Sequence, residues 1–330
     1  MRNTRILTSL IAPIYSCAFF LLLFGASMPA QLRAQRPDPR QTSGTPVLAF
    51  ISDTQMPTWI ESLWLRRHDN EEARAALFSE ITQDPTLAAL FHLGDITEAG
   101  SSDAAWKGID DARDALSRAR LPLYPAFGNH EYMWSGSDGL KNFRARFPWC
   151  EPSWYTVRVG SIAVVLLNSN LSELGESRIA AQNRWFSAVL SELDKDKGIQ
   201  AVIVGLHHSP YTNSSIVSPS VEVQAHFVPP YLASRKAVLF VSGHAHTCEH
   251  FNIHGKNFLV IGGGGGLLQP VLTGTQQRYR DLTPFTGSRR PFHFMKCRMD
   301  GDSLRVSIHM RRRSTGRIGV PYRIAIPLPR

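Results

Sequence analysis

Side chains of the kind that bind metal ions follow five apolar segments of the sequence. Ser52-Asp53-Thr54-Gln55 comes after the first segment, Gly94-Asp95 after the second and Gly128-Asn129-His130-Glu131 after the third. His207-His208-Ser209-Pro210 and Gly243-His244-Ala245-His246 follow the next two. Carboxylates and imidazoles together suit zinc, manganese and iron, and an amide oxygen is an acceptable additional ligand. The pattern therefore predicts a metal site.

The spacing inside these motifs fits metal binding in two ways. His244 and His246 are two residues apart, so an extended chain directs both rings to the same side. In a turn, each ring instead reaches a different metal ion. Glycines stand before Asp95, Asn129 and His244, where they permit tight turns and close backbone approach. Each motif alone is a weak signal, so the specific signal is the complete set in this order.

The elements that position these motifs are expected to be short buried strands that alternate with helices. Strands are expected over residues 47–51, 87–93, 121–127, 161–167, 201–206, 237–241 and 258–261, and helices over 59–81, 104–119 and 180–193. Residues 292–299 and 304–310 flank Asp300-Gly301-Asp302 and are expected to form a hairpin. Because ligands bind at the carboxyl ends of strands in open α/β sheets, the motifs are expected to converge.

The ordered set of motifs resembles the calcineurin-like metallophosphoesterases, and within them the purple acid phosphatase branch. The resemblance covers about residues 47–266, including five glycines after Ile261. It implies an α/β fold, a four-layer αββα sandwich of two mixed β-sheets flanked by helices. It also implies a binuclear centre of two divalent or trivalent metal ions (Mn, Zn or Fe). Such a centre would hydrolyse a phosphomonoester or phosphodiester with a metal-bridged hydroxide.

The resemblance implies a role for each candidate residue. Asp95 would bridge both ions, and the other ligands of the first ion would be Asp53, Gln55 and His246. Those of the second ion would be Asn129, His208 and His244, with His207 as the alternative to His208. The expected catalytic residues are His130, Asp95 and Asn129. His130 would stand beside the leaving group, Asn129 would hold phosphoryl oxygens, and Glu131 would orient an imidazole.

The sequence departs from the family pattern at two positions and leaves a choice at a third. Gln55 stands where the family usually has histidine, so the first site is expected to bind metal more weakly or to select a harder ion such as Mn. Glu98 stands where purple members have tyrosine, so no purple charge-transfer band is expected. Family members often show His-x-Pro, which favours His208 over His207 because Ser209 and Pro210 follow it.

The N-terminus has the layout of a secretory signal. Arg2 and Arg5 precede an apolar run over 11–24, and small residues follow at Ala26, Ser27 and Ala30. The run is shorter than the roughly 20 residues of a membrane-spanning helix, so cleavage is expected and no stable membrane span would remain. The sequence therefore predicts a signal peptide over 1–30, a flexible linker over 31–46 and one metallophosphoesterase domain over 47–330. The mature protein is expected to be periplasmic or secreted.

The net charge of +9 permits several anionic partners. A phosphorylated small molecule is the expected substrate, and nucleic acid is possible but not favoured, because no repeat of interleaved aromatic and basic residues is present. Two alternatives to a general phosphoesterase stay open. One is a metal-poor protein that binds a phosphorylated ligand without turnover, as Gln55 would permit. The other is an extracellular nuclease-like phosphodiesterase. Nothing in the sequence fixes the oligomeric state.

Several other residues are assigned structural roles. His92 lies inside an expected strand and is interpreted as a core histidine, and His250 and His254 are interpreted as strand and turn residues. The cysteines that follow the leader, Cys150, Cys248 and Cys297, allow one disulfide at most. Core packing is favoured over substrate stacking for the tryptophans Trp134, Trp149 and Trp154.

Overall fold

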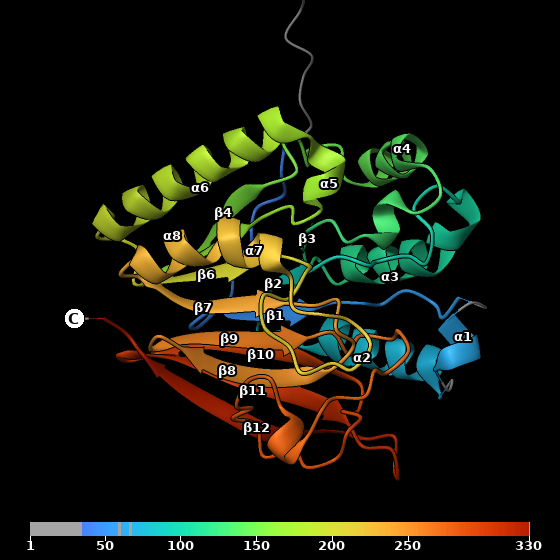
Figure 1. Ribbon diagram of the computed structural model, residues 1–330. Coiled ribbons are helices and arrows are strands. Elements are labelled where there is room, and N and C mark those ends of the chain that lie inside the picture. Colours follow the sequence, from blue (N-terminus) through green and yellow to red (C-terminus); the bar gives the residue numbers. More distant parts are fainter. Residues whose placement is uncertain (1–34, 59–60, 66–67, 330) are drawn as a thin grey trace, which may run out of the picture. The chain divides into compact units, whose positions relative to one another are not determined.

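The computed structural model describes residues 35–329, apart from residues 59–60 and 66–67 (Figure 1). Ala34–Arg330 forms one compact unit. The predicted signal peptide over 1–30 lies outside the described residues. Among the helices that are described, none combines the length and the apolar character needed to cross a bilayer.

The first sheet contains three parallel and three antiparallel strands. Its order is β12-β11-β10-β1-β2-β3. The strands β1, β2 and β3 are parallel, whereas β10 pairs antiparallel with β1 and continues into the hairpin with β11. The bounds are β1 Val47–Ile51, β2 Leu87–His92, β3 Leu123–Pro125, β10 His293–Asp300, β11 Ser303–Arg311 and β12 Ile318–Pro327.

The second sheet is also mixed, in the order β4-β5-β6-β7-β9-β8. The strands β5, β6, β7 and β9 are parallel, and antiparallel strands β4 and β8 form the two edges. The bounds are β4 Tyr155–Val159, β5 Ile162–Leu166, β6 Ala201–Gly205, β7 Ala237–Ser242, β8 Cys248–Ile253 and β9 Lys256–Ile261.

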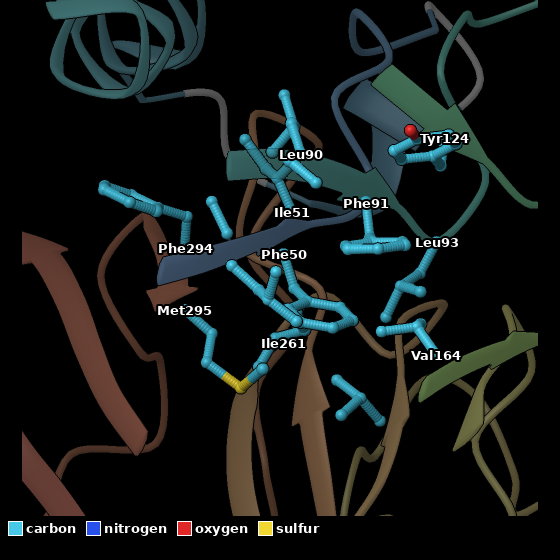
Figure 2. Close-up of a cluster of buried hydrophobic side chains, with 14 of the residues drawn as sticks. Phe50, Ile51, Leu90, Phe91, Leu93, Tyr124, Val164, Ile261, Phe294 and Met295 are labelled. Carbon is cyan, nitrogen blue, oxygen red and sulfur yellow. The ribbon is translucent and has the colours of Figure 1, made fainter. Parts of the chain in front are cut away.

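Apolar side chains join the two sheets face to face. Consecutive strand residues point to opposite faces, so a strand with all residues buried must be covered on both sides. Figure 2 shows Phe50 directed toward Ile261 of the second sheet, while the neighbouring residue Ile51 points to the opposite face together with Leu90. The Phe50 ring stacks on that of Phe91 with centroids 4.9 Å apart. This inter-sheet core fixes the relative position of the loops at the strand ends.

Helices cover the outer faces and complete four layers. Buried residues of α2 and α3 belong to the same core as the first sheet, and those of α6 and α8 pack with the second sheet (Figure 1). The bounds are α1 Glu61–Trp64, α2 Asn70–Gln83, α3 Lys107–Arg118, α4 Gly136–Arg146, α5 Leu171–Leu174, α6 Glu176–Lys195, α7 Val221–His226 and α8 Val228–Ala233. The fold is therefore the αββα sandwich of two mixed sheets that the sequence predicts.

The sequence locates the central strands well and the edges poorly. All seven expected strands and the hairpin are present, and Leu304, Val306, Ile308 and Met310 are buried as expected. The single helix expected over 59–81 is wrong, since α1 and α2 are separate. Strands β4 and β12 were not expected, because strands at sheet edges carry exposed polar residues that weaken the apolar signal. Strand β8 was expected only through the interpretation of His250 as a strand residue. The short helices α4, α7 and α8 were not expected either.

Part of the predicted linker contacts the domain. Arg40 donates hydrogen bonds from its guanidinium to the carbonyl oxygens of Leu87, Asp84 and Ala119, at 2.8–3.0 Å. Its backbone N–H donates to the Ala88 carbonyl oxygen at 2.8 Å. Because one side chain satisfies three carbonyl groups, residues near Arg40 are held against the edge of the first sheet and belong to the compact unit.

The cysteines and tryptophans sort by burial. Cys150, Cys248 and Cys297 are buried and free, so they form no disulfide. Trp149 and Trp154 pack against the apolar core, as expected. Trp134 is 76% exposed, so the core role that the sequence favoured for it is wrong.

Candidate metal centre

The loops after five parallel strands meet at one end of the sandwich. Asp53 follows β1, Asp95 follows β2 and Asn129 follows β3 in the first sheet, while His207 follows β6 and His244 follows β7 in the second. The loops are joined directly. The Asp53 N–H donates to the Gly94 carbonyl oxygen at 3.1 Å, and the Gly243 N–H donates to that of His207 at 2.9 Å. Motifs that are far apart in the sequence thus lie close together in space, as the sequence predicts.

Two glycines are required by close approach. A Cβ atom on Gly128 would overlap the backbone nitrogen and Oδ1 of Asp95, and one on Gly243 would overlap Ser52 Oγ and Asp53 Oδ2. Glycine is the one residue that leaves this space free. The expectation that glycines in the motifs serve close approach is confirmed at these positions.

Three candidate ligands have strained backbone conformations. The φ angles are 58° at Asp53, 53° at Asp95 and 64° at His244. Non-glycine residues rarely adopt this left-handed region, and such strain concentrates at functional sites. Strained turns therefore lie directly after three of the strands that carry candidate ligands.

A first cluster of donor atoms is formed by Asp53, Asp95 and His246, whose ligand atoms lie within 4.8 Å of one another. His246 Nε2 is 3.3 Å from Asp53 Oδ1. Gln55 Nε2 lies between the parts of the cluster, 3.3 Å from Asp95 Oδ2 and 3.2 Å from His246 Nε2. Asp53, Asp95, Gln55 and His246 are all buried, with at most 3% exposure. The first half-site is therefore closed.

A second cluster is formed by His207, His208 and His244, again within 4.8 Å. His207 Nε2 is 3.3 Å from Asp95 Oδ2 and 3.0 Å from Asn129 Oδ1. It is also 3.2 Å from His244 Nδ1. Unlike the first cluster, this one is partly open, because Asn129, His208 and His244 are half-buried. Asp95 belongs to the first cluster and also contacts the second through His207.

The two adjacent histidines have different surroundings. His207 is fully buried and directs Nε2 at Asp95 and Asn129. His208 Nδ1 lies 2.9 Å from Ser169 Oγ. The ring stands at the outer side, where a polar cavity of about 120 Å³ is lined by His208 and Asn129. These contacts favour His207, the alternative that the sequence left open.

Backbone carbonyl groups orient three of the imidazole rings. The Nδ1 atom of His207 lies 3.0 Å from the Leu93 carbonyl oxygen, that of His246 2.8 Å from Leu267 and that of His130 2.8 Å from Glu98. A ring that donates its Nδ1–H to a carbonyl group keeps the Nε2 lone pair free, which is the usual arrangement of a metal-binding histidine. All three Nε2 atoms face the centre as a result.

The charges of the centre are strongly coupled. Burial opposes charge on Asp95, but the imidazoles of His207, His130 and His244 lower its pKa well below the usual range. Burial also disfavours protonated His207, yet the Asp95 carboxylate raises the pKa of His207 to about 9. Burial and neighbouring imidazoles lower the pKa of His244 well below its usual value and that of His208 to about 3. His208 and His244 are thus neutral rings, whereas the Asp95 carboxylate favours the protonated form of His207.

Glu131 serves the backbone. Its carboxylate accepts hydrogen bonds from the N–H groups of Asp95, Ile96 and Gly128 at 2.6–2.9 Å. Burial, then the charge of Asp95, raises the pKa of Glu131 to about 7. The expectation that Glu131 orients an imidazole is therefore wrong. It ties the loop after β2 to the loop after β3, and its position in the Gly-Asn-His-Glu motif was the only sequence signal for it.

The remaining histidines lie outside the donor clusters. His92 is buried behind the centre, with Nε2 2.9 Å from Thr54 Oγ1, and is a core histidine as expected. His250 lies on β8 and contacts Tyr322 and Asn257, and His254 lies in the turn that follows β8, also as expected. His293 is buried beside the glycine-rich segment, a position that the sequence did not single out.

The residues present fit a pair of metal ions. Carboxylate oxygen, imidazole nitrogen and amide oxygen form two clusters that share Asp95. The Oε1 atom of Gln55 is buried and has no hydrogen-bond partner among the described residues. Turning the amide by half a rotation exchanges its nitrogen and oxygen, and directs an oxygen toward Asp95 and His246. A cation in the first cluster would satisfy that atom.

Solved structures share this fold. GAP50, the anchor in the inner membrane complex of Plasmodium, matches with a TM-score of 0.64 and 14% identity, over 87% of this chain and 90% of that chain. A dimetal phosphatase from Danio rerio matches with a TM-score of 0.54 and 14% identity, over 88% of this chain and 99% of that one. At this identity the likeness shows the fold. No curated protein matches the chain in sequence.

The sequence profile of the calcineurin-like phosphoesterase family matches residues 46–248. This range begins at the first strand of the sandwich and ends just after His246, so it contains every candidate ligand. It covers more than half of the chain. The protein therefore belongs to the calcineurin-like phosphoesterases and is a metal-dependent phosphoesterase.

Proposed function

We propose that the protein hydrolyses phosphate esters at a binuclear metal centre. The observation that carries the proposal is the position of Asp95. One oxygen of this carboxylate, Oδ2, is 3.3 Å from Gln55 Nε2 on the first side and 3.3 Å from His207 Nε2 on the second. A buried carboxylate between two donor clusters is suited to bridge two cations, since carboxylate oxygens accept more than one partner.

Each ion would have its own set of ligands. Asp53, Gln55, Asp95 and His246 would hold the first ion, and Asp95, Asn129, His207 and His244 would hold the second. His208 would lie at the open side of the second ion, held through Ser169. The choice of His207 is supported by its contacts with Asp95 and Asn129.

Two bound ions would neutralise phosphoryl charge and favour the deprotonation of water. The chain itself provides orientation and proton transfer. His130 donates through Nδ1 to the Glu98 carbonyl oxygen, which leaves Nε2 directed inward, 3.8 Å from Asp95 Oδ2. In its imidazolium form, with a proton on each nitrogen, His130 is placed to give the Nε2 proton to the departing ester oxygen. The His130 N–H also donates to Asp95 Oδ1 at 2.9 Å, so the acid and the bridging carboxylate keep a fixed separation.

The test is reconstitution of metal-free protein with Mn, Zn or Fe, followed by metal analysis and turnover of p-nitrophenyl phosphate and bis-p-nitrophenyl phosphate. We expect two ions per chain and hydrolysis that requires them. A fully loaded, folded protein that binds phosphate but turns over neither ester would support the binding-protein alternative instead.

A substrate series tests the role of His130. The variant His130→Ala is expected to lose more activity on an alkyl phosphate than on p-nitrophenyl phosphate, because p-nitrophenolate leaves without a proton. The loss on the alkyl ester is expected to be about 10²-fold or more, within the range of general acid catalysis. Equal losses on both esters would argue against proton donation.

We also propose that the protein acts outside the cytoplasm. The basis is the predicted signal peptide over 1–30. Mass determination of the mature protein from fractionated cells tests this, with the expected new N-terminus between Gln31 and Gln35. A mature chain that retains Met1 in the cytoplasmic fraction would contradict export.

A further inference from the structure

A cavity of about 550 Å³ opens beside His130. It lies where the loops after β1, β2 and β3 meet. Its lining includes Trp134, Met133 and Pro57 as apolar groups and Glu98 and Glu61 as acids. If His130 protonates the departing oxygen, the group attached to that oxygen must occupy this cavity.

Trp134 is presented to the cavity in an unusual way. Its side chain is 76% exposed and its φ angle is 69°, a left-handed conformation that is a genuine outlier for a bulky residue. Within the described part of the chain, no aromatic ring or cation stacks on it. Trp149 and Trp154, by contrast, pack against the core. An exposed indole held by a strained backbone, four residues after His130, is a feature of ligand contact.

The cavity is lined by two acidic residues. Its described lining contains Glu98, Glu61 and His130 and neither lysine nor arginine. Glu61 is fixed by Thr58, whose N–H and hydroxyl donate to Oε2 at 2.8 and 2.7 Å. The backbone carbonyl oxygen of Glu98 lies 2.8 Å from His130 Nδ1, so Glu98 is held next to the proposed proton donor. Arg74 interacts electrostatically with Glu98 and also with Glu71 and Asp111.

We propose that this cavity is a leaving-group subsite for an alcohol that carries an ammonium group. The inference rests on the proposed function. A cation over the Trp134 ring is attracted by the π electrons, and Glu98 supplies the opposite charge. The substrate is then a zwitterion, with its phosphate at the metal centre and its ammonium group in the cavity. The same carboxylates repel leaving groups that carry further phosphates, which disfavours nucleic acid.

The reaction is an ordinary hydrolysis. A bond forms between phosphorus and the oxygen of water, and the bond between phosphorus and the ester oxygen breaks. The amino alcohol leaves with a proton from His130 Nε2, and a proton lost by the water replaces it. The products are phosphate, or a phosphomonoester from a diester, and the amino alcohol.

The test compares phosphocholine with 3,3-dimethylbutyl phosphate, which has the same shape but lacks the positive charge of the ammonium group. For the wild-type holoenzyme we expect kcat/KM to favour phosphocholine by about tenfold or more, in line with a desolvated cation on tryptophan. Trp134→Ala and Glu98→Gln are each expected to reduce this ratio several-fold. Glu192→Gln, an exposed acid on α6, is the matched control and is expected to leave the ratio unchanged. Phosphoethanolamine distinguishes a primary from a quaternary ammonium group.

A wild-type ratio near one, or a ratio that neither Trp134→Ala nor Glu98→Gln changes, would overturn the subsite. Equal losses on both substrates in these variants would do the same, because they would show a damaged centre without charge selectivity. If the holoenzyme hydrolyses no ester at all, binding of tetramethylammonium, measured by calorimetry in wild type and in Trp134→Ala, decides the matter. Binding that requires Trp134 would support the subsite while the proposed function fails, and absence of binding would overturn both.

Discussion

The two halves of the candidate centre differ in burial and in donor type. The half around Asp53, Gln55 and His246 is closed and rich in oxygen ligands. The half around Asn129, His207 and His244 is partly open and rich in imidazole. Hard ions prefer oxygen ligands and softer ions prefer imidazole. If two ions bind as proposed, we expect the inner ion to be mainly structural and the outer ion to meet the substrate.

The electrostatics of the two halves differ as well. Burial disfavours protonation of His246, but the hydrogen bond and charge of Asp53 raise its pKa. In the outer half, burial and neighbouring imidazoles hold the pKa of His244 well below its usual value. In the inner half Asp53 therefore favours the protonated form of His246, whereas the outer half combines the neutral ring of His244 with His207, whose pKa Asp95 raises to about 9. Substitutions that act on one half and not on the other test this contrast.

The largest effect is expected at the residue that both halves share. Asp95→Asn keeps the shape of the side chain and removes its charge. We expect loss of both metal ions and of roughly 10³-fold or more in kcat/KM, since the charge stabilisation supplied by the ions is worth several kcal/mol. Metal analysis and turnover on p-nitrophenyl phosphate measure the two losses.

The control for this change is Asp114→Asn, an exposed carboxylate on α3. It is expected to keep two ions per chain. An Asp95→Asn protein that is folded by circular dichroism and still binds two ions would remove the basis for a shared centre.

The outer half is tested by replacing each of the two adjacent histidines in turn. His207→Ala is expected to lose the outer ion and about 10²-fold or more in kcat/KM, because a buried ring that contacts Asp95 and Asn129 is removed. His208→Ala is expected to cost about tenfold or less, because its ring is held by Ser169 at the open side. Titration with Zn in the two variants, followed by calorimetry, gives the ranking. The reverse order would restore His208 as the ligand.

The inner half is tested by restoring the residue that the family usually has. Gln55→His is expected to raise affinity for the inner ion by about tenfold, since imidazole binds transition metals more tightly than a neutral amide. Affinity for the outer ion should stay the same. Gln55→Ala is the matched variant and should lower inner affinity. A Gln55→His protein with an unaltered titration curve would show that Gln55 lies outside the coordination sphere.

Sequence alone located the candidate ligands because each follows a central parallel strand. Such strands are buried on both faces, so Val47–Ile51 and Ala201–Gly205 are continuous apolar runs that are easily found. Their carboxyl ends share one edge, which turns chain order into proximity. The positions of these strands are enough to predict that Asp53 and His244 lie close together.

The direction of an individual side chain was beyond the reach of the sequence. His207 and His208 are adjacent and chemically identical, and their difference arises from partners far away, Leu93 for one and Ser169 for the other. The sequence assigned Glu131 to an imidazole. Its partners after β2 are instead backbone N–H groups, which the packing of two loops brings to its carboxylate. Tertiary contacts therefore determine the roles of His207, His208 and Glu131. Hydrophobic periodicity does not reveal which of two adjacent loop residues makes such contacts.

The smallest expected effect concerns the scaffold that joins the two halves. Glu249 lies on β8, three residues after His246, and accepts hydrogen bonds from Thr212 and Asn213 at 2.6 and 3.0 Å, in the loop that follows His208. Burial raises the pKa of Glu249 from 4.5 to about 7, and nearby Asp281 adds to the shift while Arg290 opposes it. The folded state therefore favours the protonated form more strongly than the unfolded state does.

The sign of the pH dependence follows from this difference. The stabilising contribution of Glu249 is fully present below pH 4.5, and it is lost as the pH rises through about 7. Glu249→Gln removes the titration, so the free energy of unfolding of the variant should fall less than that of wild type between pH 5 and 8. The upper limit of the difference is roughly 3 kcal/mol, from 1.36 kcal/mol per pKa unit. Urea denaturation of the metal-free proteins at both pH values measures it, with Glu192→Gln as the exposed control. Parallel curves for wild type and Glu249→Gln would mean that the loop after His208 adapts to the charged carboxylate, and that the link between the two halves is insensitive to pH.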